Sequence, residues 1–274
     1  SISPLAADTR HDLVSDGYIV LMTINGSLTL NDGDSDTFAV SAVSDILLVT
    51  GESGDPSEDD ADNITLNATV RSTTGNISLN AADNVTQNAA GHLATSADSR
   101  TIDVLAGSGI AMNLTATTTT NNGAIRYEAA TGNITVGTLN AGAASVALIA
   151  TVGSILDLDD ADAADINANA LLLIAGTDIG TALNHLETNV ATLAASAGGA
   201  NGMFIAESLT LRIDAVTVAI DRVTANNTTS AVSNSLTDLT ATAAGNILLT
   251  VGGTFTISDG GDTSGIAVQV ATTG

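Results

Sequence analysis

Cysteine is absent from this chain of 274 residues, and aromatic side chains make up only 2% of it. Without cysteine there can be no disulfide framework, no zinc–thiolate site and no thiol nucleophile. The apolar fraction is nevertheless 44%, so a core must be built from Val, Ile, Leu and Ala rather than from rings. Many thin layers suit these small side chains better than one thick globular core.

Basic side chains are equally scarce, because six arginines and no lysine face 30 acidic residues, which gives a formal net charge of −24. Phosphate binding needs clustered Lys and Arg, so we expect no nucleic-acid partner. The missing lysine also excludes a P-loop and a Schiff-base mechanism. The chain starts at Ser1 without a basic or apolar leader, as we expect of a processed product or an excised segment.

One uncharged stretch, residues 138–156, approaches the length of a membrane-spanning helix. It contains Asn140, Gly142 and Gly153, is β-branched at its centre, and lacks the basic flank that usually anchors a span. We therefore predict buried strands separated by turns here, and no membrane span.

Turn-forming pairs followed by alternating residues recur along the chain. NGSLTLN begins at Asn25, SDILLVT at Ser44 and DNITLNA at Asp62, so the starts are almost evenly spaced. A longer repeat, seen in GNISL, GNITV, NVATL and GNILL, also recurs at nearly equal intervals. Each interval is close to three times the spacing of the shorter motifs. Alternation of period two predicts strands, and a fixed repeat predicts a solenoid. We therefore predict an all-β fold in which residues 1–274 form a single parallel β-helix, or β-solenoid, domain with about 19–21 residues per coil.

The same composition leaves little room for helices, since Gly, Asn, Thr, Ser and Asp interrupt nearly every helical window. Residues 159–170 could form one short helix, although their second half could equally lead into a strand over 171–174. Solenoid rungs stack at about 4.8 Å, so we expect slim aliphatic columns inside and no space for large rings. Asn side chains at equivalent corners can form amide ladders, for which Asn76, Asn133 and Asn246 are the candidates.

Three segments carry a family resemblance: GNISLNAADNVTQNAAG (75–91), GSILDLDDADAADINANALLLIAGTDIGTALNHLETNVATLAA (153–195) and AGNILLTVGGTFTI (244–257). They resemble the filamentous-haemagglutinin-type and β-strand-repeat surface exoproteins of bacteria. IGTALNHLETNVATLAA is the most specific part, and there the family usually has Pro where this chain has His185. The resemblance implies a right-handed parallel β-helix that serves as an extracellular stalk or adhesin without catalytic residues.

Acidic clusters are the main candidate sites. Asp32, Asp34 and Asp36 resemble the start of a calcium loop, but Thr37 and Val43 stand where such a loop needs Gly and Glu, so this is a weak calcium candidate. We expect no resident cofactor. Three further clusters are expected to be solvated loops: Glu52, Asp55, Glu58, Asp59, Asp60 and Asp62; Asp157, Asp159, Asp160, Asp162 and Asp165; Asp259 and Asp262.

Catalysis has little support, because lysine is missing, the arginines are dispersed, and His11, His92 and His185 lie far apart. We therefore predict a non-enzymatic structural segment of an extracellular or cell-surface fibre or adhesin. Its open solenoid ends are expected to join copies of itself or neighbouring repeats head to tail, and glycans are a second class of partner. A carbohydrate-binding or carbohydrate-cleaving β-helix and a surface-layer protein are the alternatives.

Overall fold

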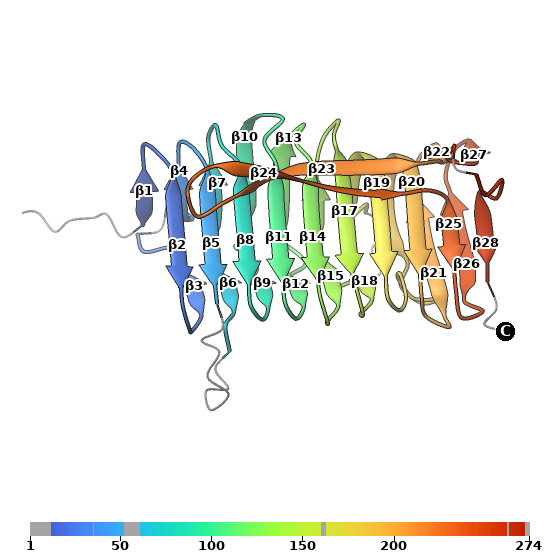
Figure 1. The fold of residues 1–274 in the computed structure, drawn as a ribbon, viewed down its shortest axis with the longest axis horizontal. Coiled ribbons are helices and arrows are strands. Elements are labelled where there is room, and N and C mark those ends of the chain that lie inside the picture. The colour runs from blue at the N-terminus through green and yellow to red at the C-terminus, as the bar shows by residue number, and fades with distance from the viewer. Residues whose placement is uncertain (1–11, 35, 52–60, 160–162, 262, 272–274) are drawn as a thin grey trace, which may run out of the picture.

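The computed structural model describes residues 12–34, 36–51, 61–159, 163–261 and 263–271. These residues form 28 strands and no helix, so the all-β prediction is confirmed. Nearly all the strands pair in parallel and stack into an elongated, solenoid-like body (Figure 1). Residues 159–170 were one candidate for a short helix, but the second half of this segment belongs to strand β19 (Ile166–Ala175).

The strands stack in three rows, each running the length of the body. The first row contains β1 (Leu13–Ser15), β4 (Phe38–Ala42), β7 (Thr69–Ser72), β10 (Leu93–Asp98), β13 (Thr117–Asn121), β16 (Thr138–Asn140), the first parts of β19 and β20 (Leu186–Ala197), and the ends of β21 (Gly202–Glu207) and β26 (Asn246–Val251). The second contains β2 (Ile19–Thr23), β5 (Ile46–Thr50), β8 (Ile77–Ala81), β11 (Ile102–Ala106), β14 (Ile125–Ala129), β17 (Ser145–Ala150), the later parts of β19 and β20, β22 (Leu211–Ile213) with β25 (Leu239–Ala241), and β27 (Phe255–Ile257) with β28 (Val268–Val270). The third contains β3 (Leu28–Leu30), β6 (Ile64–Leu66), β9 (Val85–Gln87), β12 (Ile110–Met112), β15 (Ile134–Val136), β18 (Ile155–Asp157), a bridge at Ile179, and the first parts of β21 and β26.

The number of residues per rung varies and mostly exceeds the predicted range. Ile125 pairs with Val146, which gives a rung at the upper end of that range, whereas Ile46 pairs with Ile77, which makes a rung about half as long again. Stacking fixes the register of the strands but not the length of the corners between them, so the corners absorb the difference. The longer sequence repeat does not correspond to equivalent positions in the rungs either, since GNISL belongs to β8 in the second row and GNITV to β15 in the third.

Inward side chains form aliphatic columns, as the period-two alternation predicts. One column in the second row contains alanines that are at most 4% exposed: Ala81, Ala106, Ala129, Ala150, Ala175, Ala197 and Ala241. The uncharged stretch 138–156 forms β16, β17 and β18, which confirms the prediction of strands there. In the described residues, no helix has the length and apolar character that crossing a membrane would require.

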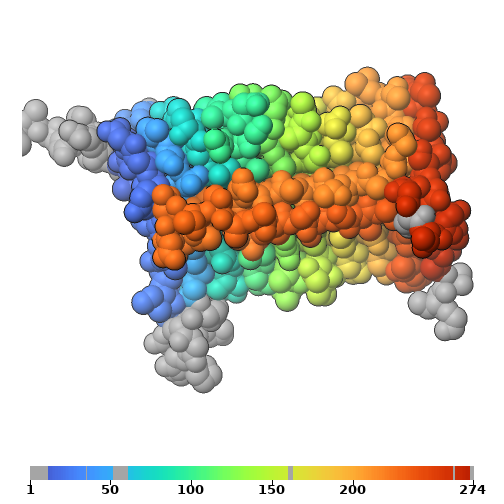
Figure 2. Space-filling view, turned by 45° about the horizontal axis from the view of Figure 1, so that its top comes forward, coloured from blue at the N-terminus to red at the C-terminus, as the bar shows by residue number. Residues whose placement is uncertain are grey.

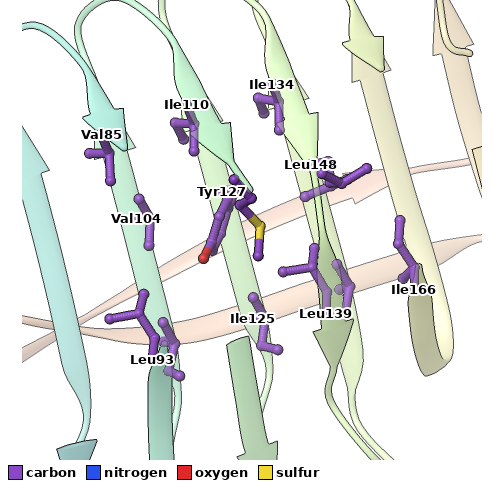
Figure 3. Packing of buried hydrophobic residues seen from close by; sticks show 14 of the residues in the cluster. Val85, Leu93, Val104, Ile110, Ile125, Tyr127, Ile134, Leu139, Leu148 and Ile166 are labelled. Carbon is purple, nitrogen blue, oxygen red and sulfur yellow. The ribbon is translucent and has the colours of Figure 1, made fainter. Parts of the chain in front are cut away.

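One large ring does fit inside, contrary to the expectation. Tyr127 in β14 is fully buried between Val104 and Leu148 of the neighbouring rungs (Figure 3). Its hydroxyl donates to the Gln87 side chain and lies 2.6 Å from the Thr118 hydroxyl. Polar residues replace aliphatic ones at these two opposing positions, which leaves space for the ring and gives its hydroxyl partners.

We expect Tyr127→Phe to lower the free energy of unfolding by about 1–3 kcal/mol, because the buried Gln87 oxygen then loses a donor. Tyr18→Phe is the matched control, since Tyr18 is 53% exposed, and it should change stability by less than about 0.5 kcal/mol. Urea unfolding measures both. Equal losses in the two variants would contradict this account of the interior.

A hairpin interrupts the rungs between β22 and β25. Its strands β23 (Val216–Val223) and β24 (Thr229–Leu236) pair antiparallel, and we call residues 216–236 the strap. The strap runs back along the long axis across the outside of the second row (Figures 1 and 2). β23 contacts β8, β11, β14, β17, β19 and β20 in turn.

The contact of the strap changes from apolar to polar along its length. Near its base, Val216 and Val218 pack on Ala147, Leu172 and Ala194, which point outward from the second row and are buried by the strap. Strands β17 and β19 are therefore apolar on both faces, as strands covered on both sides are. Towards its tip, the strap instead makes hydrogen bonds: the Asp221 N–H donates to the Thr101 hydroxyl (3.0 Å) and the Val223 N–H to the Ser78 hydroxyl (2.9 Å).

Candidate functional site

The two ends of the described stack expose apolar side chains. In the last rung, Phe255 is 42%, Ile257 54% and Val270 51% exposed, whereas equivalent positions in the middle rungs are buried. In the first rung, Leu13 is 40% exposed, whereas Val40, with which it pairs in the next rung, is 1% exposed. Figure 1 places these strands at opposite ends of the body. Each end is therefore an uncovered edge of all three rows.

The backbone of β28 presents unused hydrogen-bonding groups at this edge. The Leu239 N–H donates to the Ala267 carbonyl (3.0 Å), and the Ala271 N–H donates to the Ala241 carbonyl (2.8 Å). Peptide groups of a parallel strand alternate between its two neighbours, so the N–H and C=O groups of Val268 and Val270 point away from β25. Such an edge is a template for a further parallel strand.

The three predicted ladder asparagines do not stack on one another. Asn76 precedes β8 in the second row, whereas Asn133 precedes β15 and Asn246 begins β26, both in the third row. Two of their side chains nevertheless bind neighbouring rungs. The Asn76 Oδ1 accepts a hydrogen bond from the Thr101 N–H (2.9 Å), and the Asn133 Oδ1 accepts one from the Ser154 N–H (2.8 Å).

A true amide ladder forms at another corner, from residues that we did not single out. The Asn67 side-chain amide donates to the Asn31 Oδ1 (2.7 Å), and the Asn88 amide donates to the Asn67 Oδ1 (2.6 Å). The signal in the sequence is an Asn directly after each of β3, β6 and β9. It was obscured by the many other asparagines and by the unequal rung lengths.

The weak calcium candidate lies in an exposed corner before β4. One carboxylate oxygen from each of Asp12, Asp32, Asp34 and Asp36 lies within 4.8 Å of the other three. Several of these oxygens accept backbone hydrogen bonds, for example Asp32 from the Asp34 N–H (3.0 Å) and from the Thr37 N–H (3.1 Å). These hydrogen bonds stabilise the loop conformation without an ion. Asp32, Asp34 and Asp36 are exposed, and Asp12 is half-buried.

A second acidic cluster is more enclosed. Asp157 ends β18, Asp165 directly precedes β19, and Glu187 is the second residue of β20. One carboxylate oxygen from each lies within 4.8 Å of the other two. Asp165 is only 7% exposed, and its backbone N–H donates to the Glu187 carbonyl (3.0 Å), which places the two residues on adjacent rungs. We expected solvated loops here, so this juxtaposition was missed.

The electrostatics of this cluster are unfavourable. Burial, the negative charge of Asp157, a hydrogen bond with the Asp157 carboxylate, and the charges of Glu187 and Asp159 raise the pKa of Asp165 to about 8, and burial also raises the pKa of Asp157. Because the pKa of Asp165 is higher in the folded chain than its ordinary value of 3.8, its contribution to stability is fully present below pH 3.8 and is lost progressively as the pH rises from there through about 8. The Oδ2 atoms of Asp157 and Asp165 are buried and accept no hydrogen bond from the described residues.

Two arginines that looked dispersed in the sequence meet at one buried carboxylate. Asp103 in β11, 1% exposed, accepts from Arg126 Nη1 of β14 (2.9 Å) and from Arg222 Nε of the strap (2.5 Å). Arg126 also pairs with Glu128 and donates to Asn234 of the strap (2.7 Å). Burial lowers the pKa of Arg126, and the charge of Asp103 opposes that shift. This network joins the strap to the solenoid.

Three surface hollows contain few charged groups. The hollow lined by Asn169, Ser208 and Gly253 has no acidic or basic side chain, the one beside the strap has Asp221, and the one beside Phe204 has Asp178. In these three hollows, no carboxylate pair and no arginine come together, whereas glycoside hydrolysis uses two carboxylates that flank the scissile bond.

The histidines that the structure describes have local roles. His92 Nδ1 accepts from the Thr117 N–H (3.1 Å), and the His185 ring stacks on Phe204 with 6.1 Å between centroids. Several residues named above lie outside the described residues: His11, Glu52, Asp55, Glu58, Asp59, Asp60, Asp160, Asp162 and Asp262.

Comparisons with known proteins give this chain no relative. No family model matches it, and neither does any curated protein or any solved structure.

Proposed function

We propose that this chain is a non-enzymatic structural segment of an extracellular or cell-surface fibre, in which its rungs continue head to tail into those of a second copy or of a neighbouring repeat. In this proposal the three rows form a single right-handed parallel β-helix. The extracellular location and the handedness are supported by the sequence resemblance to bacterial surface exoproteins.

The uncovered edges are the observation that carries the proposal. Val268 of β28 continues the column that contains the buried Leu173, and Val270 continues the column that contains the buried Ala175. A further rung on this edge would bury both valines and would pair the outward peptide groups of the strand. The opposite edge, at β1, β2 and β3, has the same three rows and can supply that rung. Such a heterologous contact repeats without closing and builds a filament.

The test is association of the chain measured by sedimentation velocity, with electron microscopy of the products. Burying a valine contributes about 1.5–3 kcal/mol, so Val270→Lys should lower the head-to-tail association constant at least about tenfold. Gln269→Lys is the matched control, because it adds the same charge on the same strand while its side chain points outward. We expect it to leave end-to-end association nearly unchanged.

Two results would overturn the proposal. One is a chain that remains monomeric at every concentration studied. The other is association to which Val270→Lys and Gln269→Lys make no difference, since the contact would then lie elsewhere on the surface.

A further inference from the structure

The second acidic cluster brings one buried carboxylate, Asp165, together with two half-buried ones, Asp157 and Glu187, at one corner of the solenoid. Exposed carboxylates are solvated, and the backbone satisfies the group around Asp32. In contrast, Asp165 is only 7% exposed, and its Oδ2 accepts no hydrogen bond from the described residues. An uncompensated carboxylate is costly to bury, so this position calls for a positive partner.

The charged groups that act on Asp165 are all acidic, namely Asp157, Glu187 and Asp159. The protein therefore concentrates like charges at this corner, where their mutual repulsion opposes folding. A bound cation would reverse the sign of the interaction, because each carboxylate would then gain attraction to the ion.

We infer that Asp157, Asp165 and Glu187 form a binding site for a single divalent cation with the preferences of Ca²⁺. The three side chains supply only oxygen ligands, and hard cations prefer these, whereas Zn²⁺ and Cu²⁺ favour nitrogen and sulfur. Three carboxylates also match the charge of a divalent ion better than that of a monovalent one.

The coordination geometry favours Ca²⁺ over Mg²⁺. Ca²⁺ accepts about six to eight oxygen ligands in a flexible arrangement, whereas Mg²⁺ demands a nearly ideal octahedron and usually binds through only one or two carboxylates. The carboxylate oxygens of Asp157, Asp165 and Glu187 lie within 4.8 Å of one another, so a single ion can contact all three.

The bound ion would connect parts of the chain that are distant in sequence. Asp157 ends one rung, and Asp165 and Glu187 lie on the next two. The ion would hold the corners of three consecutive rungs together and would stabilise the solenoid in proportion to its occupancy. This inference does not depend on the proposed fibre function, since it concerns a site inside one chain.

Calorimetric titration of the full chain with CaCl₂, in buffer with added NaCl to screen diffuse binding, tests the inference. The triple variant Asp157→Asn/Asp165→Asn/Glu187→Gln should lose one saturable site. The matched control Asp32→Asn/Asp34→Asn/Asp36→Asn removes the same number of charges and should keep that site. Asp165→Asn alone, with its nearly identical shape, should weaken binding at least tenfold.

Thermal unfolding with and without Ca²⁺ provides a second measurement. Ca²⁺ should raise the melting temperature of the wild-type chain and of the control, but not that of the cluster variant. In chelator, the cluster variant should melt above wild type, because it lacks the repulsion, and this result also shows that it folds. The inference is overturned if wild type has no saturable site, if the control loses the site instead, or if Mg²⁺ binds as tightly as Ca²⁺.

Discussion

Replacing Asp103 by alanine lowers the free energy of unfolding by about 3–5 kcal/mol, the cost expected when one partner of a buried ion pair is removed. Arg126, only 4% exposed, then keeps its charge without the carboxylate that faces it at 2.9 Å. Arg222 of the strap loses the same partner. The fall in the free energy of unfolding cannot exceed the free energy with which the strap docks on the solenoid. If the strap detached, both guanidinium groups would return to water and would no longer be buried without a partner.

Urea unfolding measures this effect, and limited proteolysis locates it. We expect the turn of the strap, residues 224–228, to be cleaved faster in Asp103→Ala than in the wild-type chain. Asp98→Ala is the control, because Asp98 is exposed and should cost less than about 0.5 kcal/mol. If both aspartate variants were equally stable, the network around Asp103 would not hold the strap.

The second large effect is expected at the apolar base of the strap. Val218→Asp places a carboxylate against Ala147, Leu172 and Ala194, where no cation or hydrogen-bond donor is available from the packed side chains. The free energy of unfolding should fall by several kcal/mol, on the order of 3–5. A dye that fluoresces on apolar surfaces should bind the variant, because the outward face of β17 and β19 becomes exposed when the strap detaches.

The neighbouring position supplies a matched control. Ala219 lies on the same strand with its side chain facing solvent, so Ala219→Asp adds the same charge without entering the contact. It should leave both stability and dye binding close to those of wild type. Because Val218→Asp and Asp103→Ala act on one docked element, the double variant should lose less stability than the sum of the two losses. Full additivity would mean that the strap does not dock as a unit.

The sequence could not distinguish the strap from a rung. VTVAIDRV in β23 alternates with period two, as the rung strands do, and both kinds of strand bury every second residue. The difference lies only in what each strand packs against, which is a distant part of the chain. The same holds for the network at Asp103, because Arg222 stands far beyond Asp103 in the sequence and meets it only when the strap folds back.

The candidate cation site was hidden for a related reason. Asp157 and Asp165 were recognised as part of an acidic loop, but Glu187 stands well beyond that loop in the sequence. Only stacking of the rungs brings it beside them, through the register in which Ile166 pairs with Thr188. Asp165 is buried, unlike the exposed acids around Asp32. Whether a corner residue is buried depends on how the adjacent rungs pack against it, which the local sequence does not specify.

The sequence by itself determined the strands and their inward aliphatic faces, because alternation and small side chains act over a few residues at a time. It also determined that large rings would be rare in the interior. Only the tertiary structure decided the length of each rung, the position of Tyr127 among polar partners, the folding back of the strap, and the meeting of acids from three rungs. These features depend on register between segments that are at least one rung apart, and no local pattern specifies that register.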